Sequence, residues 1–183
     1  MPRITPVQPA DATGKAKQLL DGVQAKLGLT PNLAKTLATS PAALEGYLGL
    51  NGALAGGALD TQYREQIALV VAQANSCEYC LAAHTAIGSL AGLQPEEILA
   101  SRRARAVDAK RDAGLKFAQT VVVNRGDVSD AAVSSIRAAG FTDGEITEIV
   151  ANVALNIFTN YINLVAQTIV DFPRVDLAIS AAA

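Results

Sequence analysis

The two cysteines and the single histidine of this 183-residue chain all lie between positions 77 and 84. Cys77, Cys80 and His84 follow one another at intervals of three and four residues, so an α-helix would place them on one stripe. A thiol beside an imidazole can lose its proton, attack an electrophile and then pair with a second thiol. This spacing therefore predicts thiol chemistry on one face of a helix.

A helix that starts just before the cysteines would make them reactive. Ser76 is a suitable N-cap residue, which would place Cys77 and Cys80 at the first and fourth helical positions. Unpaired N–H groups and the helix dipole favour an anion there and lower the pKa of a thiol. His84 can relay the proton of Cys80, and Cys77 lies close enough to close a disulfide. This set favours peroxide reduction, in which the Cys80 thiolate becomes a sulfenic acid and Cys77 condenses with it.

An acidic residue that orients the imidazole would complete such a site. Glu65 is the attractive candidate, because the helix expected to carry it ends directly beside the cysteine motif. The same four side chains are also acceptable zinc ligands, although three ligands from one helix are hard to arrange as a tetrahedron. Structural cysteines beside a buried histidine are a further explanation. We favour redox chemistry over both, and we expect no metal and no cofactor.

The positions of Glu65, Cys77, Cys80 and His84 resemble the core motif of the alkylhydroperoxidase D (AhpD)-like family, part of the carboxymuconolactone decarboxylase superfamily. The resemblance implies an all-α, AhpD-like helical domain that assembles into homo-trimers or homo-hexamers. It also implies that Cys80 is the peroxidatic thiol, that Cys77 is the resolving thiol, and that Glu65 and His84 form a proton relay.

The resemblance extends over most of the chain, from about residue 31 to Pro173. Segment 158–163 and the Asp-Phe-Pro sequence that ends at Pro173 look like the peroxidase-related branch of the family. One position departs from the family pattern: Tyr79 stands where well-studied peroxidases carry a second histidine. This difference bears on the proton relay and on the docking of a reducing partner.

The composition bounds the fold and the partners. Half of the residues are hydrophobic and 17% are charged, which predicts one well-buried core and further apolar surface between subunits. The net charge is −2, and the densest basic segment, 102–111, is interleaved with aspartates, so we expect a solvated face and no nucleic-acid partner. Residues 1–9 contain no secretory signal, so we expect a cytoplasmic protein.

Helical capping patterns recur along the chain, whereas alternating strands do not, and an all-α fold is expected. We expect one domain over residues 1–183, with extended tails at 1–10 and 174–183 and a frayed end at 181–183. The expected helices cover 11–27, 32–38, 41 to about 56, 61 to about 75, 77 to 88 or 92, a short segment from 95, 108–124, 129–139 and a long segment from 143.

The long last helix contains an apolar run, 146–170, that must be tested as a membrane span. Its asparagines at 152, 156, 160 and 163 make it costly in lipid, so we expect a buried helix and no membrane. Because these amides share one face, we expect a hydrogen-bonded seam between helices or subunits. The alternative is that Asn156 or Asn160 reaches the active site.

The expected activity is reduction of small organic hydroperoxides, with an unidentified thiol, lipoyl protein or thioredoxin-like protein as reductant. Two alternatives stay open. One is a carboxymuconolactone decarboxylase-like lyase that needs no redox chemistry. The other is a dithiol redox sensor that oxidises without turnover.

Overall fold

The computed structural model describes residues 1–179, and this part of the chain consists of nine α-helices without a β-strand. The all-α prediction is therefore confirmed. The helices are α1 (Gly14–Leu27), α2 (Asn32–Leu37), α3 (Pro41–Ala55), α4 (Thr61–Ala74), α5 (Glu78–Leu90), α6 (Pro95–Arg102), α7 (Ala109–Val123), α8 (Asp130–Ala138) and α9 (Asp143–Ala166).

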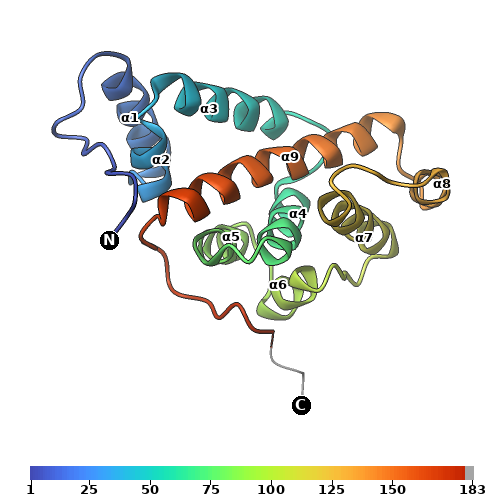
Figure 1. Ribbon diagram of the computed structural model, residues 1–183. Helices are drawn as coiled ribbons and strands as arrows, with labels where there is room; N and C mark the ends of the chain where they lie inside the picture. The colour runs from blue at the N-terminus through green and yellow to red at the C-terminus, as the bar shows by residue number, and fades with distance from the viewer. Residues whose placement is uncertain (180–183) are drawn as a thin grey trace.

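Helix α4 is the centre of the molecule and packs against α5, α6, α7 and α9 (Figure 1). Most of its residues from Gln66 onward are buried, because apolar side chains cover almost the whole circumference of the helix. Asp60 caps its first turn by accepting a hydrogen bond from the backbone N–H of Tyr63 at 2.9 Å. The candidate residue Glu65 thus lies on a rigid, central element.

Some helix boundaries differ from the sequence prediction, among them the start of α1 and the alternative end of α5 at residue 88. Helix α1 begins at Gly14 rather than at Asp11, because residues 8–12 form a turn in which Asp11 and Ala12 both donate to the carbonyl of Gln8. Helix α5 continues through Gly88 to Leu90, and the positive φ of Gly92 (96°) then redirects the chain. Helix α7 ends at Val123, within the expected range 108–124.

Helix α9 crosses the whole molecule and lies against helices from both halves of the chain (Figure 1). By length and hydropathy alone it is long enough to span a bilayer, and half of its most apolar window is buried inside the protein. Its capping box is formed as expected, with Thr142 accepting from the N–H of Glu145 at 3.2 Å and Glu145 accepting from the N–H of Thr142 at 2.7 Å. Helix α9 is therefore a buried helix of the protein core, as predicted.

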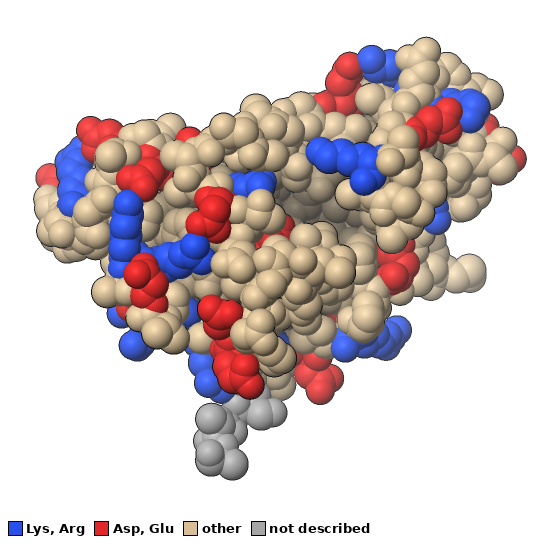
Figure 2. Space-filling view, turned by 180° about the vertical axis from the view of Figure 1, so that it is seen from behind, with Lys and Arg blue, Asp and Glu red and all other residues tan. Residues whose placement is uncertain are grey.

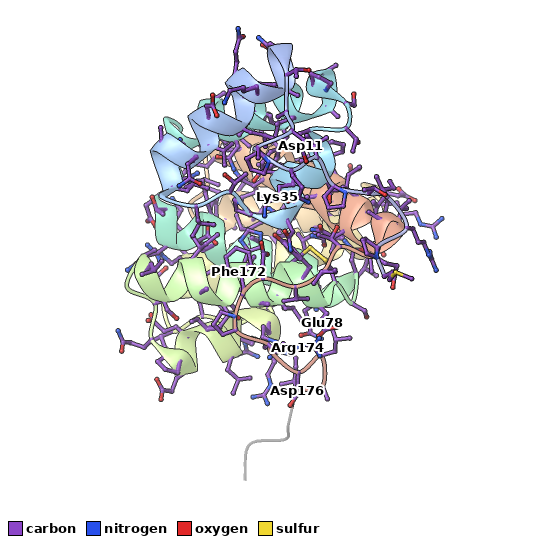
Figure 3. The ribbon with its side chains drawn as sticks, turned by 90° about the vertical axis from the view of Figure 1, so that its left-hand side faces the viewer. Asp11, Lys35, Glu78, Phe172, Arg174 and Asp176 are labelled. Atoms are coloured by element: carbon purple, nitrogen blue, oxygen red, sulfur yellow. A yellow bond between two sulfur atoms is a disulfide. The ribbon has the colours of Figure 1, made fainter. Side chains whose placement is uncertain are left out.

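The segment after α9 is extended and docks along α5 and α6 (Figure 3). The Asp171 carboxylate accepts a hydrogen bond from the backbone N–H of Asn32 at 2.7 Å, and the Phe172 ring packs edge-on against Tyr79 at 5.7 Å. Arg102 donates to the carbonyls of Asp176 and Leu177 at 2.6 and 3.1 Å. The tail is thus extended, as predicted, and is docked as far as Leu177. The predicted fraying at 181–183 lies outside the described residues.

The basic segment 102–111 is less exposed than the sequence predicts. Arg102 is only 8% exposed, because its guanidinium holds the tail and also donates to Gln73 at 2.8 Å. Lys110 and Arg111 pair with Glu145 and Asp60, which cap the helices on either side. These arginines and this lysine connect elements of the fold, so the expectation of a purely solvated face is wrong.

Asp112 holds the loop between α6 and α7, and its substitution gives a testable change in stability. Lys116 pairs with the carboxylate at 2.6 Å, and the N–H of Ala106 and the Nε of Arg105 donate to it at 3.1 and 2.9 Å. These contacts, the bond to Lys116 foremost, lower the pKa of Asp112 to about 2. Because the folded pKa lies below the unfolded value, the stabilisation is complete above about pH 4 and is lost as the pH falls through about 2.

We expect Asp112→Asn to lower the melting temperature at pH 7 by about 2–4 °C, because both cationic partners are largely exposed and the loss is about 1 kcal/mol. The difference from the unsubstituted protein should shrink between pH 4 and pH 2. Thermal unfolding followed by circular dichroism at several pH values measures this difference in melting temperature. The control is Asp127→Asn, because Asp127 is exposed. A difference that stays constant down to pH 2 would show that the charge is not the cause.

Candidate active site

Cys77, rather than Ser76, is the N-cap of α5. Ser76 adopts a left-handed conformation with φ 52°, and the helix begins at Glu78, so the predicted cap is wrong by one residue. The Cys77 sulfur accepts the N–H of Cys80 at 3.3 Å, as a capping side chain does. Both sulfurs nevertheless lie at the positive end of the helix, so the electrostatic argument from the sequence still holds.

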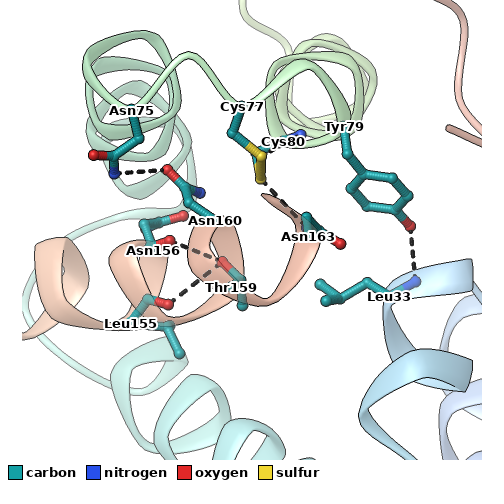
Figure 4. The surroundings of a disulfide bond; sticks show 10 residues. All are labelled: Leu33, Asn75, Cys77, Tyr79, Cys80, Leu155, Asn156, Thr159, Asn160 and Asn163. Carbon is teal, nitrogen blue, oxygen red and sulfur yellow. Dashed lines mark hydrogen bonds between the residues drawn. A yellow bond between two sulfur atoms is a disulfide. The ribbon is translucent and has the colours of Figure 1, made fainter. Parts of the chain in front are cut away.

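A disulfide joins Cys77 to Cys80, with 5.3 Å between the two Cα atoms (Figure 4). Both residues are buried, at 1% and 2% exposure, within an apolar cluster of α4, α5 and α6. The pair can therefore form without any change of the surrounding backbone. Within residues 1–179 no three His, Cys, Asp or Glu side chains are grouped as ligands for a metal ion.

Glu65 and His84 form a close pair between α4 and α5. Oε2 of Glu65 lies 2.7 Å from Nδ1 of His84, and the two side chains are 15% and 20% exposed. A carboxylate at this distance fixes the tautomer with the proton on Nδ1, which leaves Nε2 as the proton acceptor. The structure thus supplies the contact that the sequence could not establish.

A cavity of about 120 Å³ brings these groups together. Cys80, His84 and Glu65 line it, whereas Cys77 does not, so a small molecule that enters meets the sulfur of Cys80 first. Its wall comes from α1, α2, α3, α4, α5, α9 and the tail. The main lining residues are Leu27, Leu33, Tyr47, Arg64, Ala83, Ile87, Leu155, Asn156, Asn163 and Phe172. Seen from behind, the surface is hollowed near its centre, and most side chains around the hollow carry no charge (Figure 2).

Two polar side chains modify this mainly apolar wall. Burial first, and then the nearby Glu65 carboxylate, raises the pKa of Tyr47, so its hydroxyl remains a hydrogen-bond donor at neutral pH. Arg64 donates to the hydroxyl of Thr61 at 3.2 Å, while its buried Nε has no hydrogen-bond partner among the described residues. The cavity wall therefore combines apolar surface with a phenol and a guanidinium.

Tyr79 is a structural residue at the back of the site. Its hydroxyl accepts the backbone N–H of Leu33 at 3.1 Å, and its ring contacts Phe172 of the tail. Burial above all raises its pKa well above the ordinary value. The residue that replaces the family's second histidine therefore ties α2, α5 and the tail together, and its phenol does not ionise near neutral pH.

The predicted seam of asparagines on α9 is buried throughout, with exposures of 0–6%. Asn160 accepts a hydrogen bond from Asn75, the C-cap of α4, at 3.0 Å, whereas Asn152 and Asn156 donate to carbonyls of α9 itself, so the expected seam between helices is formed only in part. Asn156 lines the cavity, as the alternative proposed, whereas Asn160 does not. Sequence reasoning missed Asn163, whose Nδ2 donates to the Cys80 sulfur at 3.4 Å.

Comparison with known proteins supports the same relationship. Residues 41–120, which include all four predicted site residues, match the model of the carboxymuconolactone decarboxylase family. The comparison with curated proteins found no match.

Several solved structures share the fold. A peroxidase-related protein from Ralstonia eutropha JMP134, described as an alkylhydroperoxidase AhpD core, is 27% identical with a TM-score of 0.83, over 93% of this chain and 92% of its own. A peroxidase-related protein from Silicibacter sp. TM1040 is 25% identical with a TM-score of 0.80, over 92% of this chain and 91% of its own.

The debrominase Bmp8, solved as a cysteine variant in complex with 2,3,4-tribromopyrrole, shares the fold alone, at 19% identity and a TM-score of 0.77 over 92% of this chain and 91% of its own. The family match and the AhpD-core likeness agree with the motif formed by Glu65, Cys77, Cys80 and His84. Over residues 41–120 the chain is therefore similar to the carboxymuconolactone decarboxylase family, and its fold is AhpD-like.

Proposed function

We propose that the protein is a thiol-dependent peroxidase that reduces small organic hydroperoxides through a Cys77–Cys80 disulfide cycle. The observation that carries the proposal is the cavity on which Cys80 and the His84–Glu65 pair open together, with Cys77 behind. The two peroxidase-related neighbours at 25% and 27% identity support the same chemistry.

In the reduced protein, Nε2 of His84 takes the proton of Cys80, directly or through a water molecule, and Glu65 stabilises the resulting imidazolium. The thiolate attacks the distal oxygen of the hydroperoxide. The S–O bond forms as the O–O bond breaks, so that the sulfur is oxidised to a sulfenic acid and the proximal oxygen leaves as an alkoxide. His84 returns its proton to the alkoxide, and the alcohol departs.

Cys77 then attacks the sulfenic sulfur, which releases water and forms the disulfide seen in the structure. Two thiols from an external reductant must reopen it. Because only Cys80 lines the cavity, the reductant attacks there and Cys77 leaves. The N–H of Cys80, 3.3 Å from the Cys77 sulfur, stabilises the departing thiolate. A small dithiol, a lipoyl protein or a thioredoxin-like protein could serve.

The cavity supports a preference for organic hydroperoxides over hydrogen peroxide. Leu27, Ile87 and Phe172 supply apolar surface for an alkyl or aryl group, while hydrogen peroxide would gain nothing from them. Turnover of hydrogen peroxide equal to that of cumene hydroperoxide would refute this preference.

The first test is oxidation of the reduced protein by one equivalent of cumene hydroperoxide, followed by intact mass spectrometry. We expect the loss of two hydrogens, because a disulfide forms, and repeated turnover when a dithiol is supplied. Cysteine thiols that do not react with the hydroperoxide would refute the proposed peroxidase function. Oxidation without turnover under any reductant would indicate a redox switch instead.

A decarboxylating lyase is the second candidate, favoured by the description of the family whose model matches. The Arg64 side chain in the cavity wall is a suitable partner for the carboxylate of such a lactone. The disulfide favours the peroxidase, because the lyase reaction needs no thiol pair. Lactone decarboxylation that persists in a Cys77→Ser, Cys80→Ser double variant would favour the lyase.

We also propose that the protein is a homo-oligomer, a trimer or a hexamer, and that it acts in the cytoplasm, where thiol reductants are abundant. Several large apolar side chains of α9 and the residues after it are exposed and would be buried between subunits: Val150, Phe158, Tyr161, Val165 and Ile169.

A further inference from the structure

The side-chain amide of Asn163 contacts the Cys80 sulfur, and both residues line the cavity. Its Nδ2 donates to Sγ of Cys80 at 3.4 Å, across 83 residues of sequence. Asn163 is 4% exposed and lines the cavity. It therefore contacts the atom that reacts and also reaches the space where a substrate would lie.

The orientation of this amide follows from the chemistry of the sulfur. A disulfide sulfur carries no hydrogen, so only the NH₂ group of Asn163 can make a hydrogen bond to it. The oxygen Oδ1 must then face the other way, and Figure 4 shows it turned from the disulfide toward the side of Leu33 and Tyr79. This buried oxygen has no hydrogen-bond partner among residues 1–179.

An unpaired buried acceptor beside a reactive sulfur requires an explanation, because folded proteins satisfy nearly all such groups. The other amides lining this side of the cavity bond to their own helix. Asn152 donates to the carbonyl of Glu148 and Asn156 donates to that of Asn152, both at 2.8 Å. The NH₂ group of Asn163 instead donates to the Cys80 sulfur. Its Oδ1 has no protein partner in the described part of the chain and could accept a hydrogen bond from a molecule in the cavity.

We propose that Asn163 is a catalytic residue that bridges the nucleophile and the hydroxyl end of a hydroperoxide. Its NH₂ group donates to the Cys80 thiolate, and its Oδ1 accepts the O–H of the hydroperoxide. The inference rests on the peroxidase function proposed above and adds a binding site for the reacting group. Because Nδ2 and Oδ1 belong to one amide, the same side chain would hold both the Cys80 thiolate and the distal oxygen of the hydroperoxide.

The bonds and protons balance in this arrangement. The thiolate electron pair forms the S–O bond with the distal oxygen, which keeps its hydrogen and stays bonded to Oδ1 as the sulfenic O–H. The O–O electron pair leaves with the proximal oxygen, which receives a proton from His84. Asn163 thus positions the incoming oxygen, and His84 with Glu65 handles the leaving one.

The experiment uses the Cys77→Ser background, in which Cys80 reacts alone, and adds Asn163→Ala or the isosteric Asn163→Asp. Stopped-flow kinetics measure the second-order rate constants for cumene hydroperoxide and for an aromatic disulfide, which needs the thiolate but has no O–H. We expect Asn163→Ala to slow the hydroperoxide by about 100-fold and the disulfide by a clearly smaller factor. An equal effect on both reagents would overturn the substrate contact.

Asn163→Asp keeps the side-chain shape but replaces the donor by a carboxylate. We expect the pH at which half of Cys80 is thiolate, followed by ultraviolet absorbance, to move upward in this variant. An unchanged titration would overturn the contact between the amide and the thiolate. A parent Cys77→Ser protein that does not react with hydroperoxide would refute the proposed peroxidase function. Equal rate constants in a reactive parent and its Asn163 variants would instead refute only the role of Asn163.

Asn160→Ala is the matched control, because it removes a buried amide of the same helix that neither contacts sulfur nor lines the cavity. We expect its two rate constants to change by the same small factor, since only packing is altered. Circular dichroism verifies that each variant is folded. A preferential loss of the hydroperoxide reaction in Asn160→Ala, as large as in Asn163→Ala, would refute the assignment to Asn163.

Discussion

We expect Cys80→Ser to abolish hydroperoxide reduction and Cys77→Ser to retain one round of reaction. Cys80 supplies the sulfur that lines the cavity, so its removal leaves no nucleophile in reach of the substrate. In Cys77→Ser the first step proceeds, but no second thiol remains 5.3 Å away, measured between Cα atoms, to resolve the sulfenic acid. The two conservative substitutions therefore serve as controls for each other.

The measurement combines steady-state turnover with a sulfenic-acid trap such as dimedone and intact mass. Cys77→Ser should gain one dimedone adduct after treatment with hydroperoxide, and Cys80→Ser should gain none. Turnover that is unchanged in Cys77→Ser would contradict the resolving role. An adduct on Cys77 in the Cys80→Ser variant would reverse the assignment of the two cysteines.

We expect Glu65→Gln to lower the rate constant for oxidation of Cys80 by about 100-fold, within the range for general acid–base catalysis. The glutamine fits the same space, but it cannot stabilise a positive charge on His84 as the carboxylate at 2.7 Å does. An amide can also reverse its orientation and favour the other tautomer of the imidazole. Both effects weaken the relay without removing a packed side chain.

Stopped-flow oxidation over a range of pH values measures this effect, with the exposed Glu96→Gln of α6 as the matched control. The control should react like the unsubstituted protein, because Glu96 does not line the cavity around Cys80. A Glu65→Gln variant as fast as this control would remove Glu65 from the mechanism. Melting temperatures of both variants establish that a loss of rate is not a loss of fold.

The fold class and the reactive stripe could both be read from the sequence, because both depend on local geometry. Capping residues such as Asp60 and Thr142 fix helix starts through bonds within one turn, and these starts were predicted correctly. The common face of Cys80 and His84 likewise follows from helical periodicity. Glu65 was the candidate because its expected helix ends beside the cysteine motif, and the family resemblance implied the same residue; α4 does bring it to His84.

The exact start of α5 could not be read in this way. Ser76 and Cys77 are both able to cap a helix, and their backbone conformations decide between them. The N–H of Cys77 donates to the carbonyl of Ala72 at 2.9 Å, which holds Ser76 in a left-handed turn and leaves Cys77 at the cap. Helix starts capped by Ser76 and by Cys77 are similar in stability, so the residue types alone do not determine which of them forms.

By itself the sequence determined the helices, the thiol pair and the histidine one turn away. Only the tertiary structure decided which sulfur faces a cavity, that Asn163 of α9 contacts Cys80, and that Tyr79 holds the tail through Phe172. The sequence contained the asparagine periodicity but not the rotation of α9 relative to α5. That rotation depends on the packing of side chains from several helices at once, and contacts between residues 83 positions apart leave no periodic signal in the chain.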